Sequence, residues 1–90
     1  MRRVTVELGQ VKRTPSVLET IPEAVILKAL ARHQRGDWGC LCPEDRASNN
    51  RAVRSGDRLL SEYRTPDGTK FWVVTEADRS LTTVMLPTDY

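Results

Sequence analysis

The most constraining feature of this sequence is a pair of tight turns in its last third. Residues 59–65 and 70–76 are rich in apolar and β-branched side chains and flank Pro66-Asp67-Gly68-Thr69. A Pro-Asp-Gly turn between two such runs is typical of a β-hairpin. A second turn, Ala77-Asp78-Arg79-Ser80, precedes another strand-like run at residues 81–86. The pattern therefore predicts a three-stranded antiparallel β-meander over residues 59–86.

Helix signals dominate the part of the chain before the meander. Thr14-Pro15 and Thr20-Ile21-Pro22-Glu23 each place threonine before proline, as at a helix start. A polar surface helix is expected from Pro43 to Gly56, and alternation at residues 3–8 predicts a short strand. The predicted fold class is α+β, with a short N-terminal strand and two to three helices packed on the three-stranded antiparallel β-meander. The second helix should end at Gly36 and carry a broad apolar stripe of Ala24, Ile26, Leu27, Leu30 and Ala31.

Length and composition indicate one globular domain. The chain has 90 residues, of which 39% are hydrophobic and 29% are charged, and this composition excludes a disordered tail. No apolar run approaches the roughly 20 residues of a membrane-spanning helix. The first residues also lack the apolar segment of a secretory signal. We therefore expect a cytoplasmic protein that has no membrane partner.

The kind of positive charge is more informative than its sum. The net charge is only +2, but eleven of the fourteen cationic side chains are arginine. Guanidinium groups match phosphates and carboxylates, so this composition favours a polyanion or an acidic surface as partner. A GC-rich genome would produce the same arginine content.

Two cysteines, Cys40 and Cys42, are separated by one residue and follow His33 and Asp37. These four side chains are of metal-ligating types. Zinc sites, however, combine a C-x₂₋₄-C pair with a second ligand pair, which this sequence lacks. We expect incidental thiols, no metal site and no cofactor.

His33 is the only histidine and precedes the loop that contains Asp37. It has two interpretations: a general base oriented by Asp37, or a helix-terminal side chain that contacts the last helix carbonyls. Arg79, in the second turn, is expected to pair with Glu76 or Asp78 or to contact a ligand. The remaining polar residues of this hairpin are Thr75, Ser80, Thr82 and Thr83.

Trp38 and Trp72 are the two large aromatic anchors of the chain. Phe71 and Trp72 are adjacent in a predicted strand, so one should face the helices and the other should face outward. An outward aromatic beside arginine suits a protein contact or base stacking.

Three segments carry a resemblance to a known family. They are His33-Gln34-Arg35-Gly36-Asp37-Trp38-Gly39, Arg58-Leu59-Leu60-Ser61-Glu62-Tyr63, and Phe71 to Ser80 followed by Thr82-Thr83 and a final Leu86-Pro87 and Tyr90. On these residues the chain resembles the small "plasmid-related protein" family of bacterial plasmids and integrative elements, which implies a mobile-element setting. A looser similarity of architecture links it to ribonuclease toxins of the RelE and barnase-like type.

The first functional hypothesis is a non-enzymatic accessory protein of a mobile element that binds a host or element-encoded macromolecule, such as a defence or regulatory complex. A protein is the expected partner, and the sequence leaves the oligomeric state open. Loops concentrate binding residues, whereas no catalytic set is complete. The expected contact residues are His33, Arg35, Asp37, Trp38, Glu76, Asp78 and Arg79.

Two alternatives belong to other classes. One is a metal-independent ribonuclease with His33 as the base, Arg58 or Arg79 as stabiliser of the phosphorane charge, and Tyr63 or Thr83 positioning the 2′-hydroxyl. The other is a sequence-neutral nucleic-acid binder, although the sequence shows no basic stripe.

Overall fold

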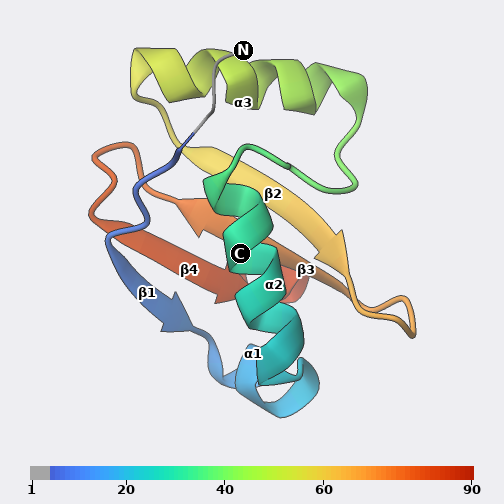
Figure 1. The fold of residues 1–90 in the computed structure, drawn as a ribbon. Coiled ribbons are helices and arrows are strands. Elements are labelled where there is room, and N and C mark those ends of the chain that lie inside the picture. The colour runs from blue at the N-terminus through green and yellow to red at the C-terminus, as the bar shows by residue number, and fades with distance from the viewer. Residues whose placement is uncertain (1–4) are drawn as a thin grey trace.

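Four strands form one mixed sheet in the computed structural model, which describes residues 5–90 (Figure 1). The strands β2, β3 and β4 pair antiparallel in succession, which confirms the predicted meander. Helices α1 and α2 cover one face of the sheet, and the fold class is α+β as predicted. The sheet order is β1-β4-β3-β2. The elements are β1 (Gln10–Arg13), α1 (Pro15–Thr20), α2 (Glu23–Gln34), α3 (Pro43–Ser55), β2 (Leu59–Arg64), β3 (Lys70–Thr75), β4 (Leu81–Met85) and the short 3₁₀ helix η1 (Pro87–Asp89).

The N-terminal strand lies later in the chain than predicted. Residues 5–9 are not a strand, and the first two residues of the predicted range lie outside the described residues. Val6 is buried instead, and its backbone N–H donates to the carbonyl of Gln34. The strand begins only after Gly9 and pairs in parallel with β4 as a fourth strand.

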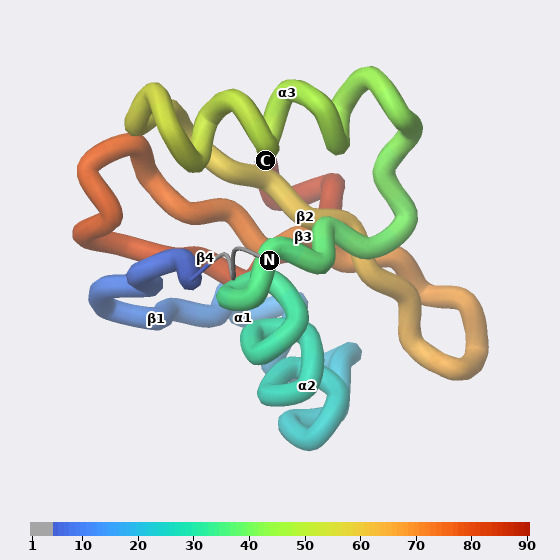
Figure 2. The backbone as a smooth tube through the Cα atoms, turned by 45° about the horizontal axis from the view of Figure 1, so that its top comes forward, coloured from blue at the N-terminus to red at the C-terminus, as the bar shows by residue number. Residues whose placement is uncertain are grey.

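The core lies between α2 and the inner face of the sheet. Phe71 is fully buried there, whereas its neighbour Trp72 faces outward and is only partly buried. Figures 1 and 2 place the last residues of the chain behind the sheet, away from α2. The core consists of Val17, Ile21, Ile26, Ala29, Leu30, Tyr63, Phe71, Val73 and Val84.

The apolar stripe of α2 is wider than the core that it contacts. Ile26 and Leu30 are buried as predicted, but Ala24, Leu27 and Ala31 are exposed. These three positions share the outer side of the helix, and none of them belongs to the core clusters of the described chain. The sequence pattern therefore predicts the helix correctly but not which part of its stripe is covered.

The free edge of β2 is covered by two segments. The side chain of Asn49 in α3 donates to the carbonyl of Leu60 and accepts from its N–H. Glu62 pairs with the backbone of Trp38 and of Cys40. The chain approaches so closely here that a Cβ at Gly39 would overlap the carbonyl oxygen of Glu62. Glycine is therefore required at this position.

Arg79 fixes the turn between β3 and β4 to the end of α3. Its guanidinium donates to the carbonyls of Asp57, at 2.7 Å, and Ala52, at 3.0 Å. It makes two longer contacts with carbonyls of its own turn. The predicted ion pairs with Glu76 or Asp78 are therefore wrong, because the side chain donates instead to the carbonyl of Asp57 and to that of Ala52, which also accepts from the N–H groups of Gly56 and Asp57. The backbone at Arg79 is left-handed, with φ of 62°.

Two substitutions of Arg79 separate the stabilisation that its hydrogen bonds provide from the strain of its left-handed backbone. Arg79→Ala should lower the free energy of unfolding by roughly 1–3 kcal/mol, because the variant loses charge-assisted hydrogen bonds to the part-buried carbonyl of Ala52 and the exposed carbonyl of Asp57. Arg79→Gly should cost about 1 kcal/mol less, because glycine adopts a positive φ without strain. Urea unfolding measures both variants. An Arg79→Ala variant as stable as the wild type would show that the guanidinium contacts contribute nothing.

Candidate binding surface

His33 lies at the centre of a buried hydrogen-bond chain that joins α2 to the sheet. Its Nδ1 is 2.6 Å from Ser61 Oγ in β2, and its Nε2 is 2.9 Å from Thr75 Oγ1 in β3. Thr75 Oγ1 lies 2.8 Å from Thr82 Oγ1 in β4. Thr82 donates to the carbonyl of Leu8 at 2.7 Å. These four side chains, here named the His33 network, have no exposed surface.

The direction of every bond in the His33 network follows from the Leu8 carbonyl, which can only accept. Thr82 uses its single hydroxyl hydrogen there, so Thr75 must donate to Thr82. Thr75 then has no hydrogen left for the imidazole, so His33 donates from Nε2. Because its lowered pKa keeps the ring neutral near pH 7, Nδ1 carries no hydrogen and accepts from Ser61. The network therefore holds the neutral Nε2–H tautomer.

This environment opposes a role for His33 as a general base. Burial, with a smaller contribution from the charge of Arg79, lowers the pKa of His33 from 6.5 to about 4. A general base needs a lone pair within reach of its substrate, but the Nδ1 lone pair is occupied by Ser61. His33 also does not bond the last carbonyls of α2, because both ring nitrogens point into the sheet.

Asp37 stabilises the loop that follows α2. Its carboxylate accepts two hydrogen bonds from the Arg32 guanidinium, at 2.8 and 3.2 Å, and one from the N–H of Gly39. The bonds from Arg32 are the main reason that the pKa of Asp37 is lowered. Arg35 approaches the same carboxylate only to 3.9 Å and remains largely exposed.

Trp38 belongs to the core and not to the exposed surface. It is 3% exposed, and its ring meets that of His33 edge-on with centroids 5.6 Å apart. Its indole N–H donates to Asn50. In this conformation Trp38 offers no surface to a partner.

The predicted contact residues of the second turn also bond within the chain. Glu76 accepts from Arg58 at 3.3 Å, and Asp78 accepts from the N–H and hydroxyl of Ser80. Arg79 bonds backbone carbonyls. Within residues 5–90, no hydrogen bond or ion pair links this turn to the loop after α2.

The five residues of the ribonuclease alternative do not converge. His33 and Tyr63 are buried on the helix side of the sheet, and the Tyr63 hydroxyl donates to a loop carbonyl at 2.5 Å. Thr83 follows buried Thr82 in β4 and therefore faces the opposite side. Arg58 bonds residues on that opposite side, and Arg79 holds the end of α3.

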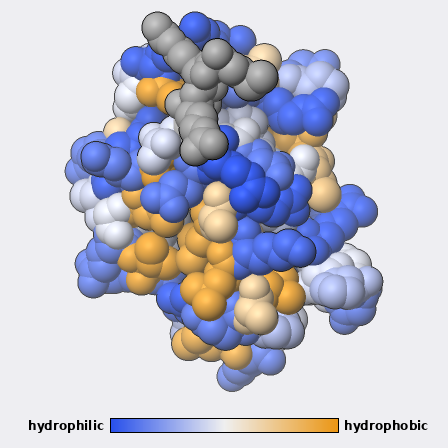
Figure 3. Space-filling model, viewed as in Figure 1, coloured by the Kyte–Doolittle hydropathy of each residue, from blue (hydrophilic) through white to orange (hydrophobic). Residues whose placement is uncertain are grey.

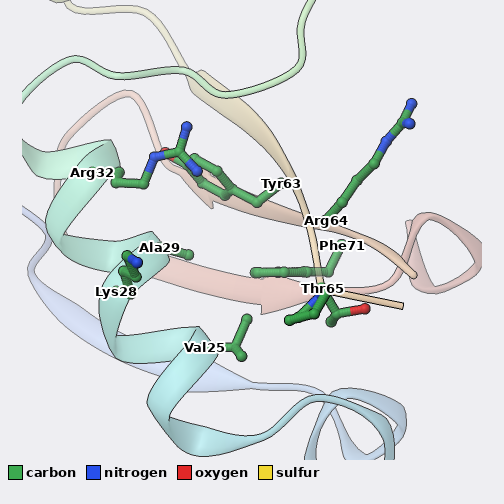
Figure 4. A pocket seen from close by; sticks show the side chains of 9 residues that line it. Val25, Lys28, Ala29, Arg32, Tyr63, Arg64, Thr65 and Phe71 are labelled. Carbon is green, nitrogen blue, oxygen red and sulfur yellow. The ribbon is translucent and has the colours of Figure 1, made fainter. Parts of the chain in front are cut away.

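A hollow of about 290 Å³ opens between α2 and the end of the β2–β3 hairpin (Figure 4). Its floor is apolar, and the Arg32 guanidinium lies 4.8 Å from the centroid of the Tyr63 ring at one side. Lys28 projects from α2 at its mouth, whereas the side chain of Arg64 points away. This volume is just below the roughly 300–1,000 Å³ of pockets for whole small molecules, so one side chain suits it better. It is lined by Val25, Lys28, Ala29, Arg32, Tyr63, Arg64, Thr65, Pro66 and Phe71.

Apolar side chains on the outer side of α2 lie next to this hollow and extend its apolar surface. Leu27 is 54% exposed, and Leu18 of α1 is 63% exposed. Figure 3, which looks onto α2, shows apolar surface in the lower half of the view with hydrophilic surface beside it. Helical spacing places Lys28 between Leu27 and the hollow. We call the hollow together with exposed Ala24, Leu27, Lys28 and Ala31 the α2 surface.

Sequence reasoning missed the α2 surface for a physical reason. The hollow forms between segments that are far apart in the chain, and Leu27 was assigned to the core because its helical spacing fits a buried stripe. The only sequence signal was the pair Lys28 and Arg32, four residues apart on one helix face.

Comparison of the sequence and the fold with protein-family models, curated proteins and solved structures gave no match. In residues 5–90, no helix is both long and apolar enough to cross a membrane.

The His33 network predicts acid sensitivity. In the unfolded chain His33 binds a proton as the pH falls below 6.5, whereas in the folded chain it stays neutral until about pH 4. Unfolding therefore takes up a proton in this window, and the free energy of unfolding should fall by about 3 kcal/mol between pH 7 and pH 4. His33→Gln should lack most of this dependence in urea unfolding.

Because His33 is the only histidine, NMR reports its protonation without ambiguity. The ring should titrate with a midpoint near pH 4 and show the Nε2–H tautomer at neutral pH. A midpoint near 6.5 would contradict the buried network.

Removing metal should not change the stability of the protein. Cys40 and Cys42 are both exposed, and no cluster of three metal-ligating side chains occurs in the described part of the chain. The melting temperature should therefore be the same with and without a chelator. A fall of several degrees would reveal a structural metal, because structural zinc contributes directly to folding.

Proposed function

We propose that this protein is a non-enzymatic accessory protein of a mobile element that binds another protein through the α2 surface. The observation that carries the proposal is the exposure of Leu27 on a helix whose inner side is already fully packed. Leu27, exposed Ala24 and Ala31 and the neighbouring hollow form one contiguous apolar surface, and such a surface supports a contact site because covering it with a partner is favourable. The resemblance to plasmid-related proteins supports the mobile-element setting.

The partner segment should be amphipathic and acidic. Apolar positions at Ala24, Leu27 and Ala31 suit an opposing helix, since the two alanines let it approach closely on either side of the leucine. The hollow accepts one apolar side chain of that helix. Lys28 and Arg35 border the surface with positive charge, which complements carboxylates on the partner.

Substitutions on the α2 surface test this proposal. Leu27→Glu and Lys28→Glu should each weaken partner binding at least about tenfold, because the first removes apolar surface and the second reverses a complementary charge. Neither should change the free energy of unfolding by more than about 0.5 kcal/mol, because both side chains are exposed. The measurement is affinity purification of the tagged protein from the cell that encodes it, with and without nuclease, followed by titration of the recovered partner.

Arg51→Glu is the matched control, because it makes the same charge change as Lys28→Glu on an exposed position of α3. The control should bind like the wild type. A protein partner that is retained by both α2 variants, or the recovery of no protein partner after nuclease treatment, would refute the proposal.

A further inference from the structure

We name the face of the sheet opposite α1 and α2 the outer sheet face. Side chains from all four strands lie on it. Alternation along the strands places Lys12 of β1, Thr83 of β4, Trp72 of β3 and Arg64 of β2 on this face. The register sets Trp72 directly between Met85 and Glu62. Sequence reasoning could not see this group, because it is assembled only by strand pairing.

An aromatic pair stands on the outer sheet face. Tyr90 is 67% exposed, yet it is held in place. Its hydroxyl accepts from Arg58 at 2.7 Å, and its ring meets that of Trp72 edge-on with centroids 5.5 Å apart. Trp72 in turn donates from its indole nitrogen to Glu62 at 3.1 Å. A fixed and exposed ring loses little further freedom when another flat ring stacks on it.

Two cations stand directly opposite each other beside this pair. Arg64 and Lys70 are cross-strand partners, and neither forms an ion pair within residues 5–90. Like charges in opposite positions repel and lower stability, and a bound anion removes that repulsion. They lie two residues along their strands from Glu62 and Trp72, a distance of about 7 Å. One stacked base and its own phosphate can therefore contact both groups.

Two carboxylates share this face. Glu76 is paired with Arg58 at 3.3 Å, whereas Glu62 accepts a hydrogen bond from the uncharged indole of Trp72 and keeps its negative charge. Three cations, Lys12, Arg64 and Lys70, form no ion pair within residues 5–90. Lys12 lies on one side of the aromatic pair, and Arg64 and Lys70 lie on the other.

We infer that the outer sheet face binds single-stranded nucleic acid without sequence preference. A base stacks on Tyr90, which Trp72 supports, and the neighbouring phosphates contact Arg64 and Lys70 on one side and Arg58 on the other. Aromatic rings and cations on an open sheet face form this kind of site, because every base has a flat face and every nucleotide has a phosphate. A duplex would not fit, because its bases are stacked on each other and are not free to stack on Tyr90.

Fluorescence anisotropy with a labelled oligonucleotide of about 12 nucleotides tests this inference. The probe is compared as RNA, as DNA of the same sequence and as the DNA duplex. Both single strands should bind more tightly than the duplex. Tyr90→Ala should weaken single-strand binding about tenfold, because it removes the ring on which the base stacks, whereas Tyr90→Phe should retain binding.

The charge contribution is measured with a pair of double variants. Arg64→Glu with Lys70→Glu should weaken binding and make its salt dependence shallower, by about 0.7 in log–log slope for each phosphate that is no longer neutralised. Arg51→Glu with Arg54→Glu makes the same change of net charge on exposed positions of α3 and should weaken binding much less.

Four results would overturn the inference: no binding of either single strand at low salt, duplex binding as tight as single-strand binding, no effect of Tyr90→Ala, or equal effects of the two double variants. The last result would indicate general attraction of a polyanion. Tyr90 does not line the α2 surface, and the side chain of Arg64 points away from the hollow whose edge it borders, so this inference and the proposed protein contact fail independently.

Discussion

The rest of the structure depends on the buried hydrogen bonds of His33. Through Ser61, Thr75 and Thr82 this one side chain joins α2 to three strands, and the last hydroxyl holds the segment before β1 through the carbonyl of Leu8. Each member has its partner, so burial of these polar groups carries little penalty. Loss of any one member would leave a buried donor or acceptor unsatisfied, which makes the alignment of α2 over the sheet specific.

The segments that carry the resemblance turn out to build this frame. In the first, His33 and Trp38 are buried against each other, and Gly39 permits close contact with β2. In the last, Thr75 belongs to the His33 network and Arg79 holds the end of α3. These residues are therefore explained by the fold. The exposed residues of the α2 surface, Ala24, Leu27, Lys28 and Ala31, lie outside those motifs, whereas the outer sheet face combines motif residues such as Trp72 and Arg58 with Arg64 and Lys70, which lie outside them.

Local signals predicted the elements of the fold, whereas the candidate sites depend on long-range pairing. Pro66-Asp67-Gly68 predicted the hairpin, and Gly36 and Gly56 predicted the ends of two helices, because each signal acts within a few residues. The strand β1 was placed too early, because Val6 and Leu8 alternate like a strand but bury their side chains beside a turn at Gly9. The like-charged pair Arg64 and Lys70 exists only in the register of the folded sheet.

Large apolar side chains of this protein lie on the α2 surface and on the outer sheet face as well as in the core. A domain of this size has only a few kcal/mol of net stability, so its apolar residues are expected to be in the core. This chain instead buries a histidine, a serine and two threonines while it leaves Leu18, Leu27 and Tyr90 largely exposed. None of these three side chains belongs to the main core cluster. In the two proposals a protein covers Leu27 and a base stacks on Tyr90, and the places of these residues on opposite sides of the sheet allow both contacts at once.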